Sequence, residues 1–491
     1  MVFVMVRSAP FARVSNHASC RNGQVSPATC RICHRTYRPR PLPGRGRASY
    51  LDRMDRRAFL ILTFAGAADP GPGPLSLTEP SPPPTDTDTP VRSGDAAFDA
   101  WAADYVTRSE QAGAPSAVLR REFAGLTPDP RVLALDGRQP EFSKPISDYI
   151  KGAVTDARTA SARTHMAAVP QLPAIETLYG VPAPVLVSVW AMETGFGAVM
   201  GDFDVLRSLA TLAAEGRRRV WAEAQITALV KIIASGEAAR AQLKGSWAGA
   251  MGQTQFEPET FLTTAVDGDG DGRRDIWGSP ADALASAANL LAKAGWAPGQ
   301  SWQAEAILPA GFDYGLAEGE RLTPAAWAAL GVRPAAPEMA RPGDAGATAQ
   351  LLLPTGAAGP AFFAFPNHFV IRKYNNSVAY ALAVGLLADR LAGAPPLTRP
   401  WPAEIPLSLA DRIAAQESLA KLGFDPGSAD GLIGSNTRMA LRAWQRARGL
   451  PADGYLSVDI VGRLVAEATL GVAPAVPTAP APAAQTTPGA P

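Results

Sequence analysis

The chain has 491 residues, with 46 Lys and Arg against 45 Asp and Glu, so its formal net charge is +1. This length corresponds to roughly three domains. The charge balance argues against a dedicated nucleic-acid-binding protein, which carries a large basic excess. From Met54 onward the sequence contains no Cys and only two His, His165 and His368. A disulfide framework, a Cys nucleophile and a multi-histidine zinc site are therefore excluded from that part of the chain.

Residues 1–53 differ in composition from the rest of the chain. They hold ten Arg, a single acid and all three Cys, with no helical or strand periodicity. A Cys-Arg-Ile-Cys-His run at 30–34 matches the c-type haem attachment pattern, but polar and basic residues follow it instead of an apolar pocket. We therefore interpret residues 1–53 as an upstream extension that is not part of the mature protein.

Residues 54–68 have the pattern of an export signal. Met54 is followed by the pair Arg56 and Arg57, an apolar run and then small residues. The paired arginines before Ala-Phe-Leu resemble the signal of the twin-arginine pathway. The apolar run, about eleven residues, is too short to span a bilayer. A buried helix is the alternative, disfavoured by the Pro-rich tract that follows. The segment predicts export to the periplasm without a transmembrane anchor.

Beyond the signal, Pro-rich segments separate helical ones. In chain order they are a Pro-rich linker at 69–94, a helical domain at 95–394, a second linker at 395–406, a small module at 407–470 and a disordered tail at 471–491. Amphipathic patterns at 220–233 and 281–294 predict helices in the large domain, whereas strand-like runs are few, the best being 369–372. The sequence predicts a mainly α protein with two folded domains.

An acid follows an apolar helical pattern at residues 184–197, which read PVLVSVWAMETGFG. Pro residues mark the start of this helix and Gly residues mark its end. Leu186, Val189, Trp190 and Glu193 fall on one face. Burial of Glu193 on that face would raise its pKa, as a general acid requires. A Glu that only binds a neighbouring loop is the alternative interpretation.

A second cluster, KGSWAGAMGQTQFEP at residues 244–258, is rich in Gly, amides and aromatic side chains. This composition suggests backbone lying close to a ligand. Trp247, Gln255 and Phe256 offer the aromatic faces and amide groups that bind sugars. A tight helix–helix crossing lined by small residues is the alternative.

A third cluster, RKYNNSVAYAL at residues 372–382, opens another helix. Asn375 or Asn376 would cap it, which is also the plain structural explanation for these amides.

Together the three clusters resemble the membrane-bound lytic transglycosylase B family of peptidoglycan-cleaving enzymes. The resemblance runs from about residue 98 to residue 391 and includes Leu-Thr-Pro-Asp-Pro at 126–130 and Tyr-Gly-Val-Pro at 179–182. It implies a lysozyme-like, mainly helical catalytic domain with a glycan cleft, and Glu193 as the single catalytic acid and base. The residues that it and the sugar-binding pattern place at the glycan are Ser246, Gln255, Phe256, Tyr374, Asn375 and Tyr380.

The implied reaction needs only one carboxylate. Hydrolytic glycosidases generally use two, and no second one stands out in these clusters. Glu193 would protonate the glycosidic oxygen, and the C6 hydroxyl of the same muramic acid would then close a 1,6-anhydro ring, so no catalytic cofactor is needed. A muramidase that uses water at the same Glu193, and a wall-binding protein without catalysis, stay open as alternatives.

An acidic loop at residues 267–278 matches EF-hand spacing, with Gly at position 12 where a Glu is usual. Asp282 in the next helix is the substitute acid. The predicted ligands of a structural calcium ion are Asp267, Asp269, Asp271, Arg273, Asp275 and Asp282. A polar turn whose Asp residues only cap and solvate is the alternative.

The module at 407–470 resembles the three-helix peptidoglycan-binding domain attached to many cell-wall enzymes. Two Asp-Gly turns, at 430–431 and 453–454, separate its short helices, with Leu441 and Trp444 on one face. The resemblance implies peptidoglycan glycan strands as the partner, with other cell-wall enzymes as further partners. Asp430, Thr437 and Gln445 have a purely structural alternative as turn and cap residues.

Overall fold

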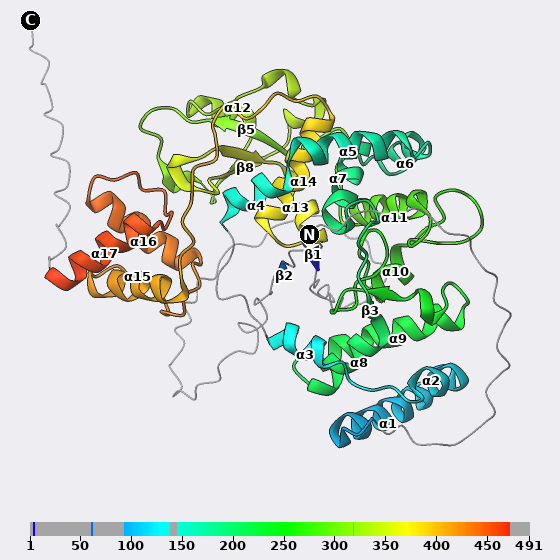
Figure 1. Ribbon diagram of the computed structural model, residues 1–491. Coiled ribbons are helices and arrows are strands. Elements are labelled where there is room, and N and C mark those ends of the chain that lie inside the picture. The colour runs from blue at the N-terminus through cyan, green and yellow to red at the C-terminus, as the bar shows by residue number, and fades with distance from the viewer. Residues whose placement is uncertain (1–2, 5–59, 62–92, 138–144, 318, 472–491) are drawn as a thin grey trace, which may run out of the picture.

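The computed structural model describes residues 3–4, 60–61, 93–137, 145–317 and 319–471 (Figure 1). The predicted extension at 1–53, export signal at 54–68, first linker and C-terminal tail lie almost wholly outside the described residues. Their boundaries stay predictions.

The described residues form seventeen α-helices, and the large domain is mainly helical as predicted. The helices of the large domain are α1 (Ala96–Gln111), α2 (Ser116–Phe123), α3 (Pro130–Gly137), α4 (Ile146–Ala153), α5 (Asp156–Ala167), α6 (Leu172–Tyr179), α7 (Ala183–Thr194), α8 (Val205–Glu215), α9 (Arg219–Ala234), α10 (Pro258–Thr264), α11 (Pro280–Lys293), α12 (Pro324–Ala329), α13 (Pro366–Tyr374) and α14 (Val378–Leu391). The patterns at 220–233 and 281–294 are confirmed as α9 and α11.

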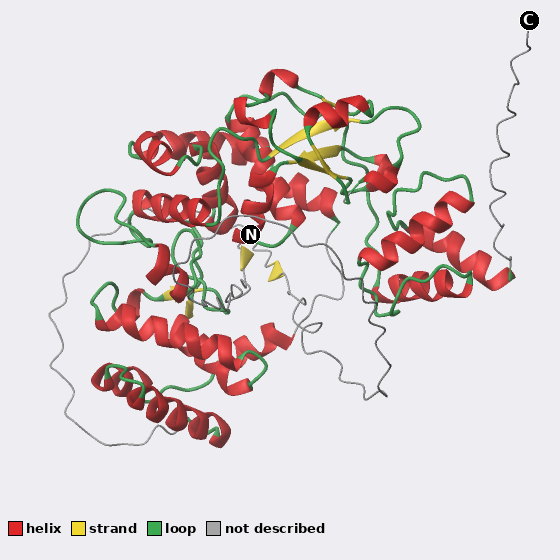
Figure 2. Cartoon of the chain, turned by 180° about the vertical axis from the view of Figure 1, so that it is seen from behind, coloured by secondary structure: helices red, strands yellow, loops and turns green. Residues whose placement is uncertain are grey.

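A five-stranded antiparallel sheet lies at one end of the large domain, away from α1 and α2 (Figures 1 and 2). Its strands are β5 (Gln303–Ile307), β6 (Arg321–Leu322), β7 (Arg333–Pro334), β8 (Ala349–Leu352) and β9 (Ala361–Ala364), in the order β6-β8-β9-β5-β7. The sheet has its own apolar core around Trp327 and Phe363. The sequence did not predict this sheet, because strands of two to five residues are too short to show a periodic pattern.

The strand-like run at 369–372 is in fact helical, so that prediction was wrong. It lies inside α13, which begins at Pro366, a residue suited to the first turn of a helix. Val370 and Ile371 are buried there, and this packing outweighs the β preference of branched side chains.

The described residues also contain two short strand pairs outside this sheet. β1 (Phe3–Val4) pairs with β2 (Leu60–Ile61), and β3 (Phe203–Asp204) pairs with β4 (Lys244–Gly245), both antiparallel.

Helix α7 is the centre of the large domain. It carries apolar side chains on every side, and its residues from Val185 to Thr194 are all buried, as expected for a helix enclosed by others. Helices α5, α6, α11 and α14 pack against it. No single helix in the described residues is long and apolar enough to cross a membrane; α6 and α7 pass that test only as a pair bent by 108°.

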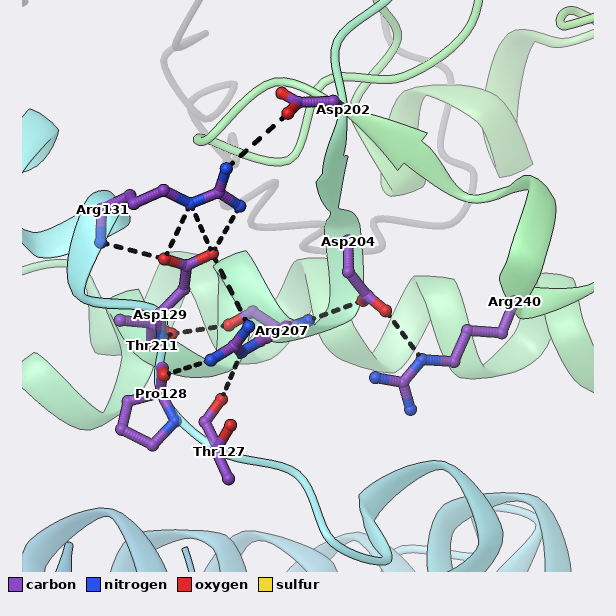
Figure 3. Close-up of polar contacts among 9 residues, drawn as sticks. All are labelled: Thr127, Pro128, Asp129, Arg131, Asp202, Asp204, Arg207, Thr211 and Arg240. Atoms are coloured by element: carbon purple, nitrogen blue, oxygen red, sulfur yellow. Dashed lines mark hydrogen bonds and ion pairs between the residues drawn. The ribbon is translucent and has the colours of Figure 1, made fainter.

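The segment between α2 and α3 is fastened to α8 by polar contacts (Figure 3). Arg207 donates hydrogen bonds to the carbonyl oxygens of Thr127, at 2.8 Å, and Pro128, at 2.7 Å. The Thr211 hydroxyl accepts from the backbone N–H of Asp129 at 2.9 Å. The Leu-Thr-Pro-Asp-Pro stretch noted in the sequence therefore joins the α1–α2 pair to the body of the domain.

The C-terminal module is a separate three-helix unit, as predicted. Its helices are α15 (Leu409–Lys421), α16 (Ser435–Ala447) and α17 (Val458–Leu470), packed around Leu441 and Trp444. The Gln445 amide accepts from Gly454 N–H at 2.8 Å and donates to Asp453 at 2.8 Å. Gln445 thus holds the second Asp-Gly turn, which bears out its structural interpretation.

A buried histidine in α13 predicts acid-sensitive stability. The His368 side chain is fully buried, and among the described residues neither ring nitrogen has a hydrogen-bond partner. Burial, and then the positive charge of Arg372, lowers the pKa of His368 from 6.5 to about 3. The native state therefore keeps this ring neutral at pH values where the unfolded chain binds a proton.

Above pH 6.5 the His368 ring is neutral in both the folded and the unfolded chain, so it does not lower the free energy of unfolding. As the pH falls from 6.5 toward 3, the unfolded chain binds a proton that the native state does not, and the free energy of unfolding falls. We expect the free energy of unfolding of the wild type, relative to His368→Leu, to fall by up to about 1.4 kcal/mol per pH unit in that window. Urea unfolding of both proteins at pH 7.5, 6 and 5 measures it. A constant difference between the two proteins at all three pH values would contradict the expectation.

Candidate active site

Glu193 lies in the last turn of α7, where the sequence places it. Pro182 is the N-cap residue, and Gly195, in a left-handed conformation with φ of 59°, ends the helix. The Glu193 side chain is 0% exposed. Because the face that it shares with Leu186 and Trp190 is apolar and buried, the carboxyl group stands at the edge of the hydrophobic core.

The backbone immediately after α7 is strained. Phe196 has a φ of 66°, a left-handed conformation that is costly for a residue with a side chain. Its ring stacks on that of His165, with centroids 4.2 Å apart and planes within 7°. Both rings meet Trp190 edge to face at 5.5 Å. The aromatic contacts hold Phe196 in a conformation that sets the direction of the chain next to Glu193.

Tyr380, at the start of α14, is the hydrogen-bond partner of the candidate acid. Its hydroxyl donates to Glu193 Oε1 at 2.6 Å. Burial raises the pKa of Tyr380 well above 10, and the charge of Glu193 raises it further. The hydroxyl therefore stays protonated near neutral pH and acts as a donor to the carboxylate.

Tyr149 of α4 is a member of this site that sequence analysis missed. Burial raises the pKa of its hydroxyl, and the charge of Glu193 is the second cause. The only sequence signal was a Tyr in a helix with no motif around it. The Tyr149 and Tyr374 hydroxyls also raise the pKa of Tyr380, so three tyrosines gather near one carboxyl group.

The second cluster forms a tight loop and not a helix crossing. Ser246 N–H donates to the Ala250 carbonyl oxygen at 2.8 Å, and the Ser246 hydroxyl accepts from Ala250 N–H at 3.0 Å. A Cβ on Gly245 would come within 2.1 Å of the Ala250 carbonyl oxygen, so only Gly fits there. Gln255, with a φ of 51°, donates through Nε2 to the Met200 carbonyl oxygen at 3.0 Å.

Thr194 joins this loop to the end of α7. Its buried hydroxyl donates to the Gln253 carbonyl oxygen at 2.7 Å and accepts from Gly197 N–H at 2.8 Å. One side chain therefore sets the spacing between the Glu-Thr-Gly-Phe-Gly and Gly-Ala-Met-Gly-Gln motifs.

The third cluster supplies Tyr374, whose hydroxyl donates to the Thr254 carbonyl oxygen. Phe256 lies in the main hydrophobic core and packs its ring on Tyr374 at 6.4 Å. Asn375 is the C-cap residue of α13. The predicted Asn cap of the following helix was wrong, because Ser377 occupies that position and accepts from Tyr380 N–H at 3.2 Å.

Glu193, Thr194, the loop at 244–258, Tyr374 and Tyr380 are thus brought together from three separate motifs. The assignment of Ser246, Gln255, Phe256, Tyr374, Asn375 and Tyr380 as glycan contacts stays a prediction. Of these six residues, Tyr380 donates a hydrogen bond to the Glu193 carboxyl group.

The acidic loop gathers four of the predicted calcium ligands. The carboxylate oxygens of Asp267, Asp269, Asp271 and Asp282 lie within 4.8 Å of one another. Backbone N–H groups, chiefly that of Gly272, lower the pKa of Asp267, whereas burial raises the pKa of Asp282.

Asp275 is not part of this group. Its Oδ1 accepts from the N–H groups of Trp277, at 3.0 Å, and Gly278, at 2.8 Å. Its side chain closes a turn, and its assignment as a calcium ligand stays a prediction. The part of Arg273 in the loop stays a prediction.

Residues 97–389, more than half of the chain, match the family described as the Transglycosylase SLT domain. The chain belongs to this family. Residues 408–464 match a peptidoglycan-binding domain family. The predicted fold, a lysozyme-like, mainly helical domain followed by a three-helix module, is confirmed, with the five-stranded sheet as an addition.

Three relatives illustrate the range of similarity. Membrane-bound lytic murein transglycosylase B of Escherichia coli (strain K12) is 33% identical over 218 residues, 44% of this chain and 58% of that protein. The match therefore spans less than two thirds of that relative. SltB3 from Pseudomonas aeruginosa, solved with NAG-anhNAM-pentapeptide, is 46% identical with a TM-score of 0.71, covering 75% of this chain and 100% of its own. The Escherichia coli lytic transglycosylase Slt35, solved with calcium, is 27% identical with a TM-score of 0.51, covering 61% and 94%.

The Thr194 bridge predicts a large stability effect. Thr194→Val keeps the shape but leaves the buried Gln253 carbonyl group and the half-buried Gly197 N–H without this partner. We expect the free energy of unfolding to fall by about 2–4 kcal/mol, measured by urea denaturation. Thr263→Val is the matched control, because the Thr263 hydroxyl is exposed and bonds only within its own helix. A loss as small as that of Thr263→Val would show that the bridge contributes little.

Proposed function

We propose that the protein is a lytic transglycosylase that cleaves the β-1,4 bond between N-acetylmuramic acid and N-acetylglucosamine in peptidoglycan. The observation that carries the proposal is the bond between Tyr380 and Glu193 at 2.6 Å, at the point where the three family motifs meet. The family match supports the reaction class. The peptidoglycan fragments bound to SltB3 and the second domain both support the substrate.

In the first step, Glu193 in its protonated form donates a proton to the glycosidic oxygen. The C1–O bond breaks, and the N-acetylglucosamine side leaves as an alcohol. The Glu193 carboxyl group is fully buried, and loss of contact with water makes ionisation costly, which favours the proton donor before the reaction. The Tyr380 hydroxyl then stabilises the carboxylate that forms, because it is held in place as a hydrogen-bond donor.

In the second step, the Glu193 carboxylate removes the proton from the C6 hydroxyl of the same muramic acid. The C6 oxygen bonds to C1, which gives a 1,6-anhydro end and restores the protonated acid. The attack is intramolecular, so proximity replaces a positioned water. Among the described residues, the charge of Glu193 raises the pKa of both Tyr149 and Tyr380. A single carboxylate at this position suits a reaction that needs one acid.

Residues outside the catalytic domain support a place in the cell wall. The export pattern at 54–68 supports delivery to the periplasm by the twin-arginine route, and the module at 408–464 supports retention on peptidoglycan strands. Association with other cell-wall enzymes is part of the same proposal.

The acidic loop fits a structural calcium ion. Carboxylate oxygens are the ligands that Ca²⁺ prefers, and four of them within 4.8 Å repel one another unless a cation lies between them. Asp267, Asp269, Asp271 and Asp282 would hold the ion and tie the loop to α11. The calcium complex of Slt35 supports this assignment.

The reaction predicts a specific product. Purified peptidoglycan incubated with the protein should release muropeptides lighter by one water than reducing muropeptides, as measured by mass spectrometry. Glu193→Gln should release none, because the amide cannot donate the proton. Tyr380→Phe should release the same product about 10–100-fold more slowly, since it removes a hydrogen bond to a charged group.

Other products would decide between the alternatives. Reducing ends would make the protein a muramidase that uses water at Glu193. Binding of the wall without any soluble product would leave a non-catalytic wall-binding protein and would falsify the proposed activity.

Calcium should raise the stability of the protein. At a calcium concentration 100-fold above Kd, the gain in free energy of unfolding is about 2.7 kcal/mol, which thermal unfolding with and without a chelator measures. Asp267→Asn should abolish the shift, whereas Asp104→Asn should keep it, because the Asp104 side chain is 61% exposed on α1, outside the acidic loop. Equal melting temperatures with calcium and with chelator would remove the ion from the proposal.

A further inference from the structure

The segment that leads from α14 to the C-terminal module is bound to the catalytic domain along its length. The Glu305 carboxylate of β5 accepts from the Thr398 N–H at 2.8 Å, the Thr398 hydroxyl at 3.0 Å and the Arg399 N–H at 3.0 Å. Trp401 stacks on Phe362 of β9, with ring centroids 5.8 Å apart. The segment therefore follows a fixed path over the sheet before it reaches the module.

Helix α4 takes a cap for its first turn from this segment. The first N–H groups of a helix have no partner inside the helix, and the N-cap residue of α4, Pro145, makes no side-chain hydrogen bond to them. Glu404, 257 positions along the chain from Ser147, accepts from the Ser147 N–H through Oε2 at 2.8 Å. Its negative charge at this end of the helix is also favourable. Lys151 of α4 adds a bond to the Pro402 carbonyl oxygen at 3.3 Å.

The second carboxylate oxygen of Glu404 binds the C-terminal module. Oε1 accepts from the Tyr455 hydroxyl. Next to this bond, Asp453 accepts from the Ala357 N–H at 2.8 Å. Gly356 allows this close approach, because a Cβ there would come within 2.6 Å of the Tyr455 Cβ. One carboxylate is thus shared between the first turn of α4 and the module.

Helix α4 connects this carboxylate with the candidate active site. Tyr149 follows Ser147 by two positions, and its side chain is buried. Burial, and then the charge of Glu193, raises the pKa of the Tyr149 hydroxyl. The helix also packs against α14, whose Tyr380 hydroxyl donates to Glu193 at 2.6 Å. A shift in the first turn of α4 would therefore move a side chain that interacts with the candidate acid.

We propose that Glu404 is a positioning residue for the reaction at Glu193. It holds α4, and with it Tyr149, in place, and the C-terminal module holds Glu404 through Tyr455. This assignment rests on the proposed function and goes beyond it, because it gives the module a second role besides retention on the wall. The module supports the catalytic site from within the molecule, and its effect is on the rate of the reaction.

Kinetics of the full chain on a soluble tetrasaccharide of alternating N-acetylglucosamine and N-acetylmuramic acid test this role. The probe carries no peptide and forms no wall, so retention on the wall does not enter the rate. Glu404→Ala should lower kcat about tenfold, the effect of losing a hydrogen bond to a charged group, with KM changed less than about twofold. Tyr455→Phe should lower kcat in the same direction by about threefold, because the Ser147 bond is kept.

A conservative variant and a matched control separate the bonds of Glu404 from its charge and size. Glu404→Gln should keep most of the wild-type kcat, because its amide can accept from the Ser147 N–H and donate to the Tyr455 hydroxyl. Glu417→Ala is the control and should behave as wild type, since Glu417 is an exposed acid on α15 of the same module.

Hydrogen exchange gives a readout that does not depend on activity. In Glu404→Ala, the backbone amides of α4 should exchange about tenfold faster than in the wild type, because the first turn loses a hydrogen bond to a charged group. The amides of α8 and α9 should exchange at unchanged rates. Mass spectrometry of the peptides that contain residues 146–153 and 205–234 measures both.

Three results would overturn the proposal. They are an unchanged kcat in Glu404→Ala, a rise in KM at constant kcat, and equal losses in Glu404→Ala and Glu404→Gln. Faster exchange throughout the catalytic domain would also overturn it, since that result indicates a general structural role. If the wild type forms no anhydro product, the proposed function fails by itself, and the exchange of α4 still decides whether Glu404 holds the helix.

Discussion

The burial of α7 is the constraint on which the rest of the structure depends. A helix that is apolar on every side must be covered on every side, and α5, α6, α11 and α14 supply that cover. The same enclosure surrounds Glu193 with apolar packing and places the Tyr380 hydroxyl as a hydrogen-bond donor to its carboxyl group. A fold requirement and a chemical requirement are thus met by the same packing, because a carboxyl group at the edge of a core is held in one orientation and shielded from water.

The strained backbone after α7 follows from that constraint. Three consecutive residues, Gly195 to Gly197, have positive φ, and Thr194 ties this turn to the loop at 244–258. The stack of Phe196 on His165 offsets part of the cost of its left-handed conformation. The hydrogen bonds of Thr194 therefore fix the turn and the loop relative to each other next to Glu193, which favours a preorganised site.

Helix α14 connects this site with the outer parts of the protein. Its first turn carries Tyr380, and its last turns, with Asp389, line a cavity of about 910 Å³. The linker beyond it joins the two domains through Glu404, which accepts from Ser147 N–H at 2.8 Å and from the Tyr455 hydroxyl of the C-terminal module. Asp453 of the module accepts from Ala357 N–H at 2.8 Å. The module is thus fastened to the catalytic domain by polar contacts on two sides.

The sequence by itself determined the helices, the candidate acid and the two-domain order. Apolar periodicity, Pro at helix starts and Gly at helix ends are local signals, and they placed Glu193 at the end of α7 correctly. Only the tertiary structure decided what surrounds it. Tyr149 has no local signal, the sheet strands are too short to show periodicity, and spacing alone did not show which acids of the loop at 267–282 lie together. These features depend on contacts between distant segments, and the free energy of such contacts is set by packing that no local pattern records.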